Sequence, residues 1–158
     1  MDPSQWLASF RITHEKARRG ELKEAERKTY LEMRDELARS MMAAANQPQV
    51  VGQRASRVFS IAHVFPIEIA ATHKTMTREI SCRAFIANVP QVYEVGDVVK
   101  FALTPKRGAE PITGEAKVTF VQKQPANSTR ITASFTLGEL QLEALEHALF
   151  DAALSRFG

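Results

Sequence analysis

The sequence predicts an all-β core, a small antiparallel β-barrel, with helices on both sides of it along the chain. Three observations predict this class. The first 47 residues are dense in Ala, Glu, Lys, Arg, Leu and Met, residues 50–135 favour Val, Ile, Phe and Thr, and helical periodicity returns after residue 135. We therefore divide the chain into a helical amino-terminal extension, residues 1–47, and a barrel domain with a carboxy-terminal packing helix, residues 48–158.

The amino-terminal extension predicts two helices separated at Gly20, because glycine readily ends a helix. The second helix carries apolar side chains at steps of three and four residues, which form one stripe: Tyr30, Met33, Leu37 and Met41. An apolar stripe needs a cover. The cover is either the barrel of the same chain or a partner protein, a second copy included, so these four residues form a candidate partner-binding face.

The central region predicts five strands, because apolar and polar residues alternate there and turn-prone residues separate the runs. They are expected at residues 57–71, 76–89, 98–105, 113–124 and 129–135. Short strands at this spacing are typical of a small barrel or sandwich. The final helix then follows, with Thr136 and Glu139 at the spacing of a capping box and with Leu145 and Leu149 on its apolar face.

Four segments, taken in their order and spacing, resemble the PilZ family of bacterial cyclic di-GMP receptors. They are Phe65–Ile69, Arg78–Ala87, Glu94–Phe101 and Ile131–Phe135. The resemblance covers about residues 54–154 and implies a PilZ-like β-barrel closed by a helix. It also implies a ligand site made of two short motifs.

The first family motif is an Arg-x-x-x-Arg pair, whose planar guanidinium groups clamp phosphates and stack on purines. Here Arg54 and Arg57 are one residue closer than that spacing. Counted back from Pro66, the two motif positions hold Ser56 and Ser60 instead. The resemblance therefore implies a weakened phosphate clamp.

The second family motif is Asp/Asn-x-Ser-x-x-Gly, which reads a guanine edge and lets backbone approach the base. Glu79 stands for Asp or Asn, Ser81 is retained, and Ala84 replaces the glycine, whose missing Cβ permits close approach. Arg83 lies inside this motif as a further cationic candidate.

These departures predict a non-enzymatic bacterial regulatory protein that acts through protein–protein contacts and binds cyclic di-GMP weakly or not at all. The resemblance implies motility or polarity control. One alternative stays open. In it, the protein is a cyclic di-GMP receptor with a rearranged site built from Arg54, Arg57, Glu79, Ser81, Arg83 and Ala84.

Other classes of function find little support in the sequence. The single cysteine, Cys82, cannot form an intrachain disulfide and has no motif naming a catalytic base, and the four histidines lack metal-ligand spacing, so we expect no catalytic residue, metal or cofactor. A net charge of +3 with basic residues not interleaved with aromatics argues against a nucleic-acid partner. The amino terminus lacks signal-peptide features and the most apolar stretch is too short to span a bilayer, which predicts a cytoplasmic protein.

Overall fold

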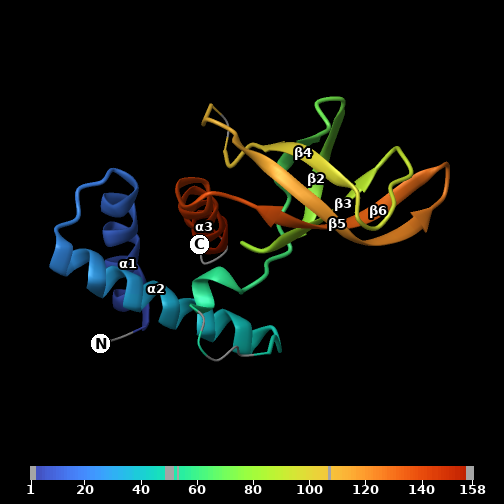
Figure 1. Ribbon diagram of the computed structural model, residues 1–158. Coiled ribbons are helices and arrows are strands. Elements are labelled where there is room, and N and C mark those ends of the chain that lie inside the picture. Colours follow the sequence, from blue (N-terminus) through green and yellow to red (C-terminus); the bar gives the residue numbers. More distant parts are fainter. Residues whose placement is uncertain (1–2, 49–51, 53, 107, 156–158) are drawn as a thin grey trace. The chain divides into compact units, whose positions relative to one another are not determined.

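A computed structural model describes residues 3–48, 52, 54–106 and 108–155 (Figure 1). The chain divides into two compact units, Met1–Phe59 and Ser60–Gly158, which we call the helical unit and the barrel unit. The division falls at Phe59, later in the chain than the change in composition after residue 47.

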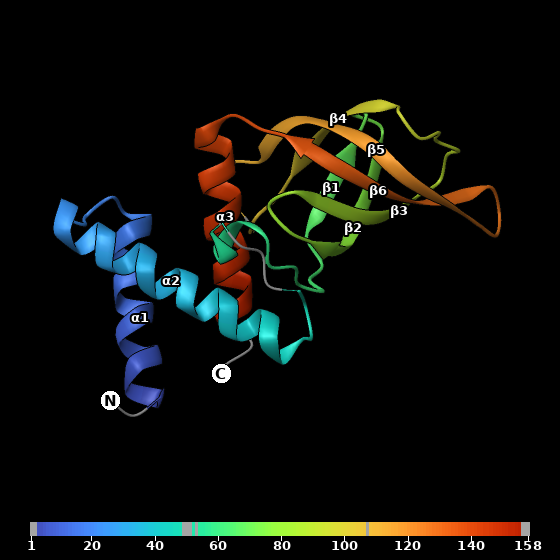
Figure 2. The same ribbon diagram turned by 60° about the horizontal axis from the view of Figure 1, so that its bottom comes forward.

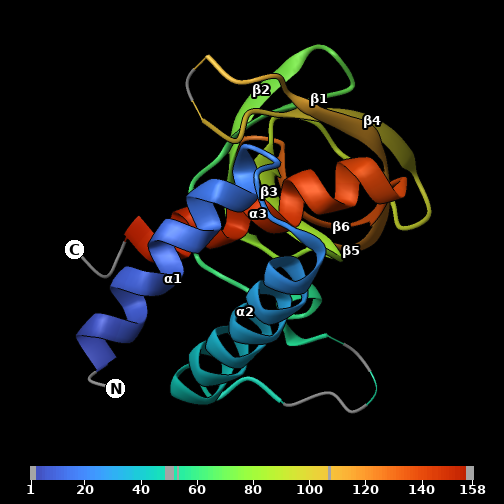
Figure 3. The same ribbon diagram turned by 90° about the vertical axis from the view of Figure 1, so that its left-hand side faces the viewer.

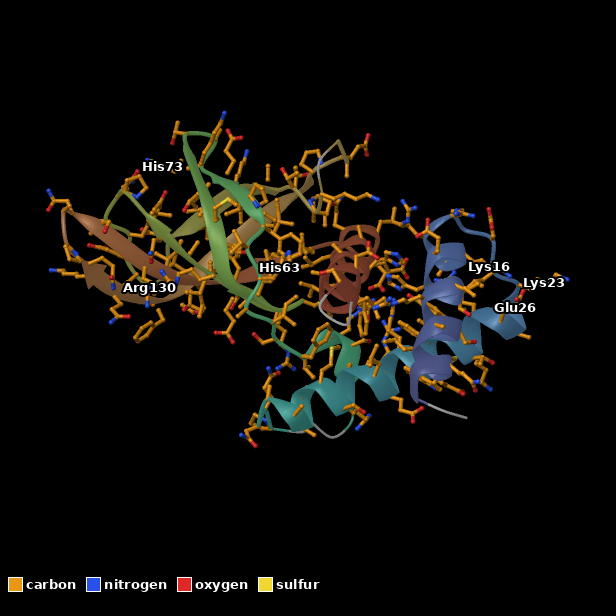
Figure 4. The ribbon with its side chains drawn as sticks, turned by 180° about the vertical axis from the view of Figure 1, so that it is seen from behind. Lys16, Lys23, Glu26, His63, His73 and Arg130 are labelled. Carbon is orange, nitrogen blue, oxygen red and sulfur yellow. The ribbon has the colours of Figure 1, made fainter. Side chains whose placement is uncertain are left out.

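The helical unit contains α1 (Pro3–Arg18), α2 (Glu24–Ala44) and the short 3-10 helix η1 (Ala55–Arg57) (Figure 3). The predicted break at Gly20 is confirmed. Gly20 has a φ of 71°, a left-handed conformation that glycine adopts without a steric cost. At the start of α2 the backbone N–H of Lys23 donates to Glu26 Oε1 at 3.2 Å (Figure 4), so a side chain satisfies a donor there.

An aromatic cluster joins α1 to α2. The Phe10 and Tyr30 rings stack with centroids 5.7 Å apart, and His14 Nδ1 lies 2.7 Å from the Tyr30 hydroxyl oxygen in a buried hydrogen bond. The Arg34 guanidinium lies 5.2 Å from the centroid of the Tyr30 ring, at cation–π distance. A buried aromatic contact of this kind stabilises the hairpin beyond simple area burial.

The buried line on α2 differs from the stripe that the sequence predicts. Its members are spaced at four residues: Tyr30, Arg34, Ala38 and Met42. Of the predicted stripe only Tyr30 belongs to this line, and Met33, Leu37 and Met41 are half-buried beside it. The single step of three, from Tyr30 to Met33, moved the predicted stripe off the buried line, because three residues turn about 300° around the helix axis and four turn about 400°.

The barrel unit confirms the predicted small antiparallel barrel (Figures 1 and 2). Its strands are β1 (Pro66–Ile69), β2 (His73–Ile80), β3 (Ala84–Val89), β4 (Val98–Leu103), β5 (Ile112–Gln124) and β6 (Ser128–Thr136). They close in the order β1-β2-β3-β6-β5-β4. The β1–β4 pairing closes the ring, with Ile67 opposite Leu103 and Ile69 opposite Phe101.

Two of the predicted strands differ in their bounds from the strands that the structure shows. The run 57–71 was wrong as one strand: it contains the end of η1 and an isolated bridge from Ile61 to Ile80, and only Pro66–Ile69 forms β1. The buried side chains still alternate along the run, so its periodicity was correct. The run 76–89 was also wrong as one strand, because a turn at 81–83 divides it into β2 and β3.

A threonine hydroxyl explains part of the shortening of β1. Thr77 Oγ1 accepts from Phe65 N at 2.9 Å and donates to the carbonyl of His63 at 2.8 Å. The Thr77 hydroxyl thus accepts the hydrogen bond from Phe65 N that a backbone carbonyl would accept in a regular β-ladder. The strand β1 therefore begins only at Pro66. His63 lies in this loop (Figure 4).

The last helix, α3 (Glu139–Leu154), follows β6 (Figure 2). Leu145 and Leu149 are buried as predicted, but the capping box is wrong. Gly138 occupies the N-cap without a side-chain cap bond, so Glu139 is the first helical residue and lies too early for that motif. Among the described residues, no helix combines the length and apolar character needed to cross a bilayer.

Candidate functional site

The turn between β2 and β3 holds the second candidate motif, and Ser81 organises it. Ser81 Oγ accepts from the backbone N–H of Arg83 at 3.1 Å and from that of Ala84 at 3.3 Å. Ser81 N donates to the carbonyl of Ala84 at 2.9 Å. Ser81 therefore stabilises the turn, because its hydroxyl oxygen accepts hydrogen bonds from backbone N–H groups of the same turn.

Glu79 lies just before this turn, beside a bulge in the β2–β3 pairing. Its side chain is exposed, and Oε1 accepts the Ser60 hydroxyl at 2.8 Å. The two residues are 19 positions apart in the chain. Ser60 is the residue at one of the two positions where the family resemblance implies an arginine, so a neutral hydroxyl partners the carboxylate there.

The rest of the turn is held by the barrel. The carbonyl of Arg83 accepts from Phe135 N at 2.8 Å, and Ala84 pairs with Ser134 at the start of β3. The Arg83 side chain is exposed, Cys82 is buried, and Ala84 is half-buried with its methyl where glycine would leave space. The turn is thus hydrogen-bonded to the end of β6 as well as within itself.

The arginine pair belongs to the helical unit. Arg54 is exposed and Arg57 is half-buried, and the N–H of Arg57 donates to the carbonyl of Arg54 at 2.9 Å within η1. Between them, the N–H of the buried Ser56 donates to Asp35 Oδ1 at 3.3 Å, which ties η1 to α2. The same carboxylate pairs with Arg39 at 2.9 Å.

Of the predicted site residues, the barrel unit brings together Glu79, Ser81, Arg83 and Ala84 within two residues of one turn. Ser60 joins them through its bond to Glu79. The sequence placed Ser60 in a motif position but offered no signal for this bond, because the two residues belong to segments that only the barrel brings together.

A hollow of about 470 Å³ lies at the β1–β2 turn and the start of β4, at the opposite end of β2 from Glu79. It is lined by Ala70, Ala71, Gln91, Tyr93, Asp97, Val98, Val99 and Lys100. Burial, with the nearby Asp97 carboxylate as a smaller cause, raises the pKa of Tyr93 above its ordinary value of 10.0. The sequence analysis could not predict this hollow, because alanines in a turn form no recognisable pattern.

Comparison with known proteins identifies the fold. No protein-family model and no curated protein matches the sequence. The chain is similar to the solved structure of the Bacillus subtilis inhibitor of motility, MotI/DgrA, with 16% identity and a TM-score of 0.52 over 61% of this chain and 49% of that one. The chain thus spans 49% of the length of that protein, and at this identity the likeness shows the fold alone.

A second similar structure is a pathogenic protein from Xanthomonas campestris, a tetrameric PilZ domain that self-assembles through an unusual helical bundle. The match has 14% identity and a TM-score of 0.46, and it covers 99% of this chain and 82% of that one.

Proposed function

The barrel unit is PilZ-like, and from this premise we propose that the chain is a non-enzymatic bacterial regulatory protein. It acts in the cytoplasm through contacts with other proteins and binds cyclic di-GMP weakly or not at all. The name of the similar Bacillus subtilis protein, an inhibitor of motility, supports a role in motility control.

The hydrogen bond between Ser60 and Glu79 carries this proposal. A cyclic dinucleotide presents two phosphates, which are held best by permanent cations. Ser60 offers only a neutral hydroxyl, and that hydroxyl donates to a carboxylate whose charge repels phosphate. Each lost charge-assisted hydrogen bond removes about 1.5–3 kcal/mol. At about 1.4 kcal/mol per decade, two lost clamps weaken binding by roughly two to four orders of magnitude.

Isothermal titration calorimetry of the full chain with cyclic di-GMP tests the proposal. We expect no saturable binding at micromolar ligand. The triple variant Ser60→Arg/Glu79→Asp/Ala84→Gly restores one phosphate-binding arginine, the shorter acidic side chain of the second motif and its glycine. We expect this variant to bind cyclic di-GMP with a measurable heat. Thermal unfolding of both proteins checks that the substitutions leave the barrel folded.

The opposite result would establish the receptor instead. Micromolar saturable binding by the unmodified chain, abolished by Arg54→Ala or Arg57→Ala, would assign the ligand to a rearranged site and overturn the proposal.

We also propose that the half-buried residues of α2, Met33, Leu37 and Met41, contact a partner protein, which can be a second copy of the chain. Tyr30, the fourth member of the predicted face, is 3% exposed and packs inside the hairpin, so it supports the face from beneath. Methionine side chains are flexible and adapt to differently shaped surfaces, which suits an interface.

A further inference from the structure

The outer surface of the barrel carries an apolar patch around Phe120. Three large apolar side chains there are mostly exposed: Phe120 at 61%, Val95 at 63% and Val98 at 60%. We define the Phe120 face as Ile86, Val95, Val98, Lys117, Phe120 and Arg130. An exposed aromatic among exposed aliphatic side chains is uncommon on a monomer surface and marks an interaction site.

The strand registers place all of these residues except Val95, which lies in the turn before β4, on one side of the sheet. On β6, Thr132 and Ser134 are two residues apart and so face the same side, and they lie opposite Phe120 and Lys117 of β5. Thr132 also lies opposite Ile86 of β3, on the far side from Phe120. A row therefore runs from Phe120 across β6 to Ile86.

The first residues of β4 extend the patch in the other direction. Val98 lies opposite Lys117, and Gly96 N donates to the carbonyl of Val118 at 2.8 Å. This bond holds Val95 next to the bulge that precedes Phe120. Cross-strand neighbours of this kind have Cβ atoms about 4.5–5.5 Å apart, close enough for one partner segment to contact them together.

The charges of the Phe120 face are positive. Lys117 is exposed, and no carboxylate in the described part of the chain pairs with it or with Arg130. The Nε of Arg130 donates to Asn88 Oδ1 at 3.0 Å, which holds the guanidinium across β3 and β6 (Figure 4). Two strand carboxylates border the face: Glu115 lies opposite Lys100, and Glu79 lies opposite Ile86 and accepts from the Ser60 hydroxyl.

We infer that the Phe120 face docks an acidic segment of a partner protein that inserts an apolar anchor beside Phe120, between Lys117 and Arg130. This inference deepens the proposed function, since it names the surface and the chemistry of the partner. Aromatic residues and arginines dominate the energetics of protein interfaces, and unpaired cations select acidic partners. Single-stranded nucleic acid fits less well, because successive bases need several stacking platforms and this face has a single exposed aromatic.

A peptide-display selection against the intact protein tests the inference. We expect the enriched short peptides to combine Asp or Glu with Phe, Leu or Met. Their binding, measured by fluorescence anisotropy, should weaken by about tenfold or more in Phe120→Ala. It should also weaken in Lys117→Glu and Arg130→Glu, whose reversed charges repel the peptide.

Two matched variants serve as controls. Lys123→Glu makes the same charge change on the same strand, but Lys123 lies opposite the buried Thr129 and therefore on the other side of the sheet. Leu140→Ala removes an apolar side chain that is 83% exposed on α3. Both should bind as the unmodified protein does, and circular dichroism should show all variants folded.

Failure to enrich any peptide, enrichment of basic peptides, or unchanged binding by Phe120→Ala would overturn the inference. Binding of oligothymidylate that depends on Phe120 would also overturn it and assign the face to nucleic acid. These outcomes are independent of the calorimetry, because a cyclic di-GMP site would refute the proposed function while leaving an acidic-peptide site in place.

Discussion

At the scale of single residues, small polar groups determine the character of the candidate site. Ser81 stabilises the β2–β3 turn through two backbone N–H groups, and Ser60 donates to Glu79. A residue that matches a binding motif can therefore serve the fold alone. Ser81 matches the family motif by type, yet its hydrogen bonds explain its presence without a ligand.

Two alanines at the β1–β2 turn show strain at the same scale. Ala70 and Ala71 have φ values of 55° and 59°, where an L-residue other than glycine costs about 1–2 kcal/mol. We expect Ala70→Gly and Ala71→Gly each to raise the free energy of unfolding by about 0.5–1 kcal/mol, the gain left after glycine's extra entropy in the unfolded chain. Urea denaturation measures the change.

Ala102→Gly in β4 is the matched control, because Ala102 lies within a regular strand. There the same substitution should lower stability by about 0.5–1 kcal/mol. If Ala70→Gly and Ala71→Gly destabilise as Ala102→Gly does, the turn does not hold its left-handed conformation.

At the scale of the element, α2 has two distinct neighbouring faces. The line Tyr30, Arg34, Ala38 and Met42 is buried, whereas Met33, Leu37 and Met41 are only partly covered. A periodic apolar pattern identifies a helix, but a side chain one position away from the buried line can remain accessible to a partner. The partner role of α2 depends on that accessible fraction.

Leu37→Asp tests this role. We expect sedimentation equilibrium to show self-association of the unmodified chain at high concentration and a monomer for Leu37→Asp, because an interface does not tolerate an unpaired buried carboxylate. Far-UV circular dichroism should be unchanged, since Leu37 is only half-buried.

Glu36→Ala alters the adjacent exposed position and should leave the association unchanged. Equal masses for the Leu37→Asp and unmodified chains would remove α2 as a self-association surface.

At the scale of the whole molecule, closure of the barrel determines which backbone amides are protected from hydrogen exchange. Each of the six strands pairs with two neighbours, so the ring has no free edge along its full circumference. The end of the β5–β6 hairpin differs, because Gln124 and Ser128 pair only with each other beyond the span of β3 and β4.

Hydrogen–deuterium exchange should separate these regions. We expect the amides that donate across the closing β1–β4 seam, such as Ala70 to the carbonyl of Lys100 and Thr104 to that of Pro66, to exchange only through global unfolding, and amides near Gln124 to exchange through local opening. If β1 exchanges as fast as the hairpin end, the ring is not closed in solution.

The sequence by itself determined the class of the fold. Composition separated helical from β segments, period-two runs identified which side chains face the core, and the PilZ-like arrangement followed from four segments. These features are local, since rotamer entropy and strand pleating act between residues close together in the chain. The residue types of the degenerate motif were equally visible.

Only the tertiary structure decided which distant groups meet and which surface stays open. The bond from Ser60 to Glu79, the ladder position taken by the Thr77 hydroxyl and the exposure of Phe120 each depend on strands joined by the closed barrel. The alternation of apolar and polar residues indicates whether a side chain faces inward or outward, but it does not indicate the register between strands. Because the register brings the Phe120 face together, that site could not be read from the sequence alone.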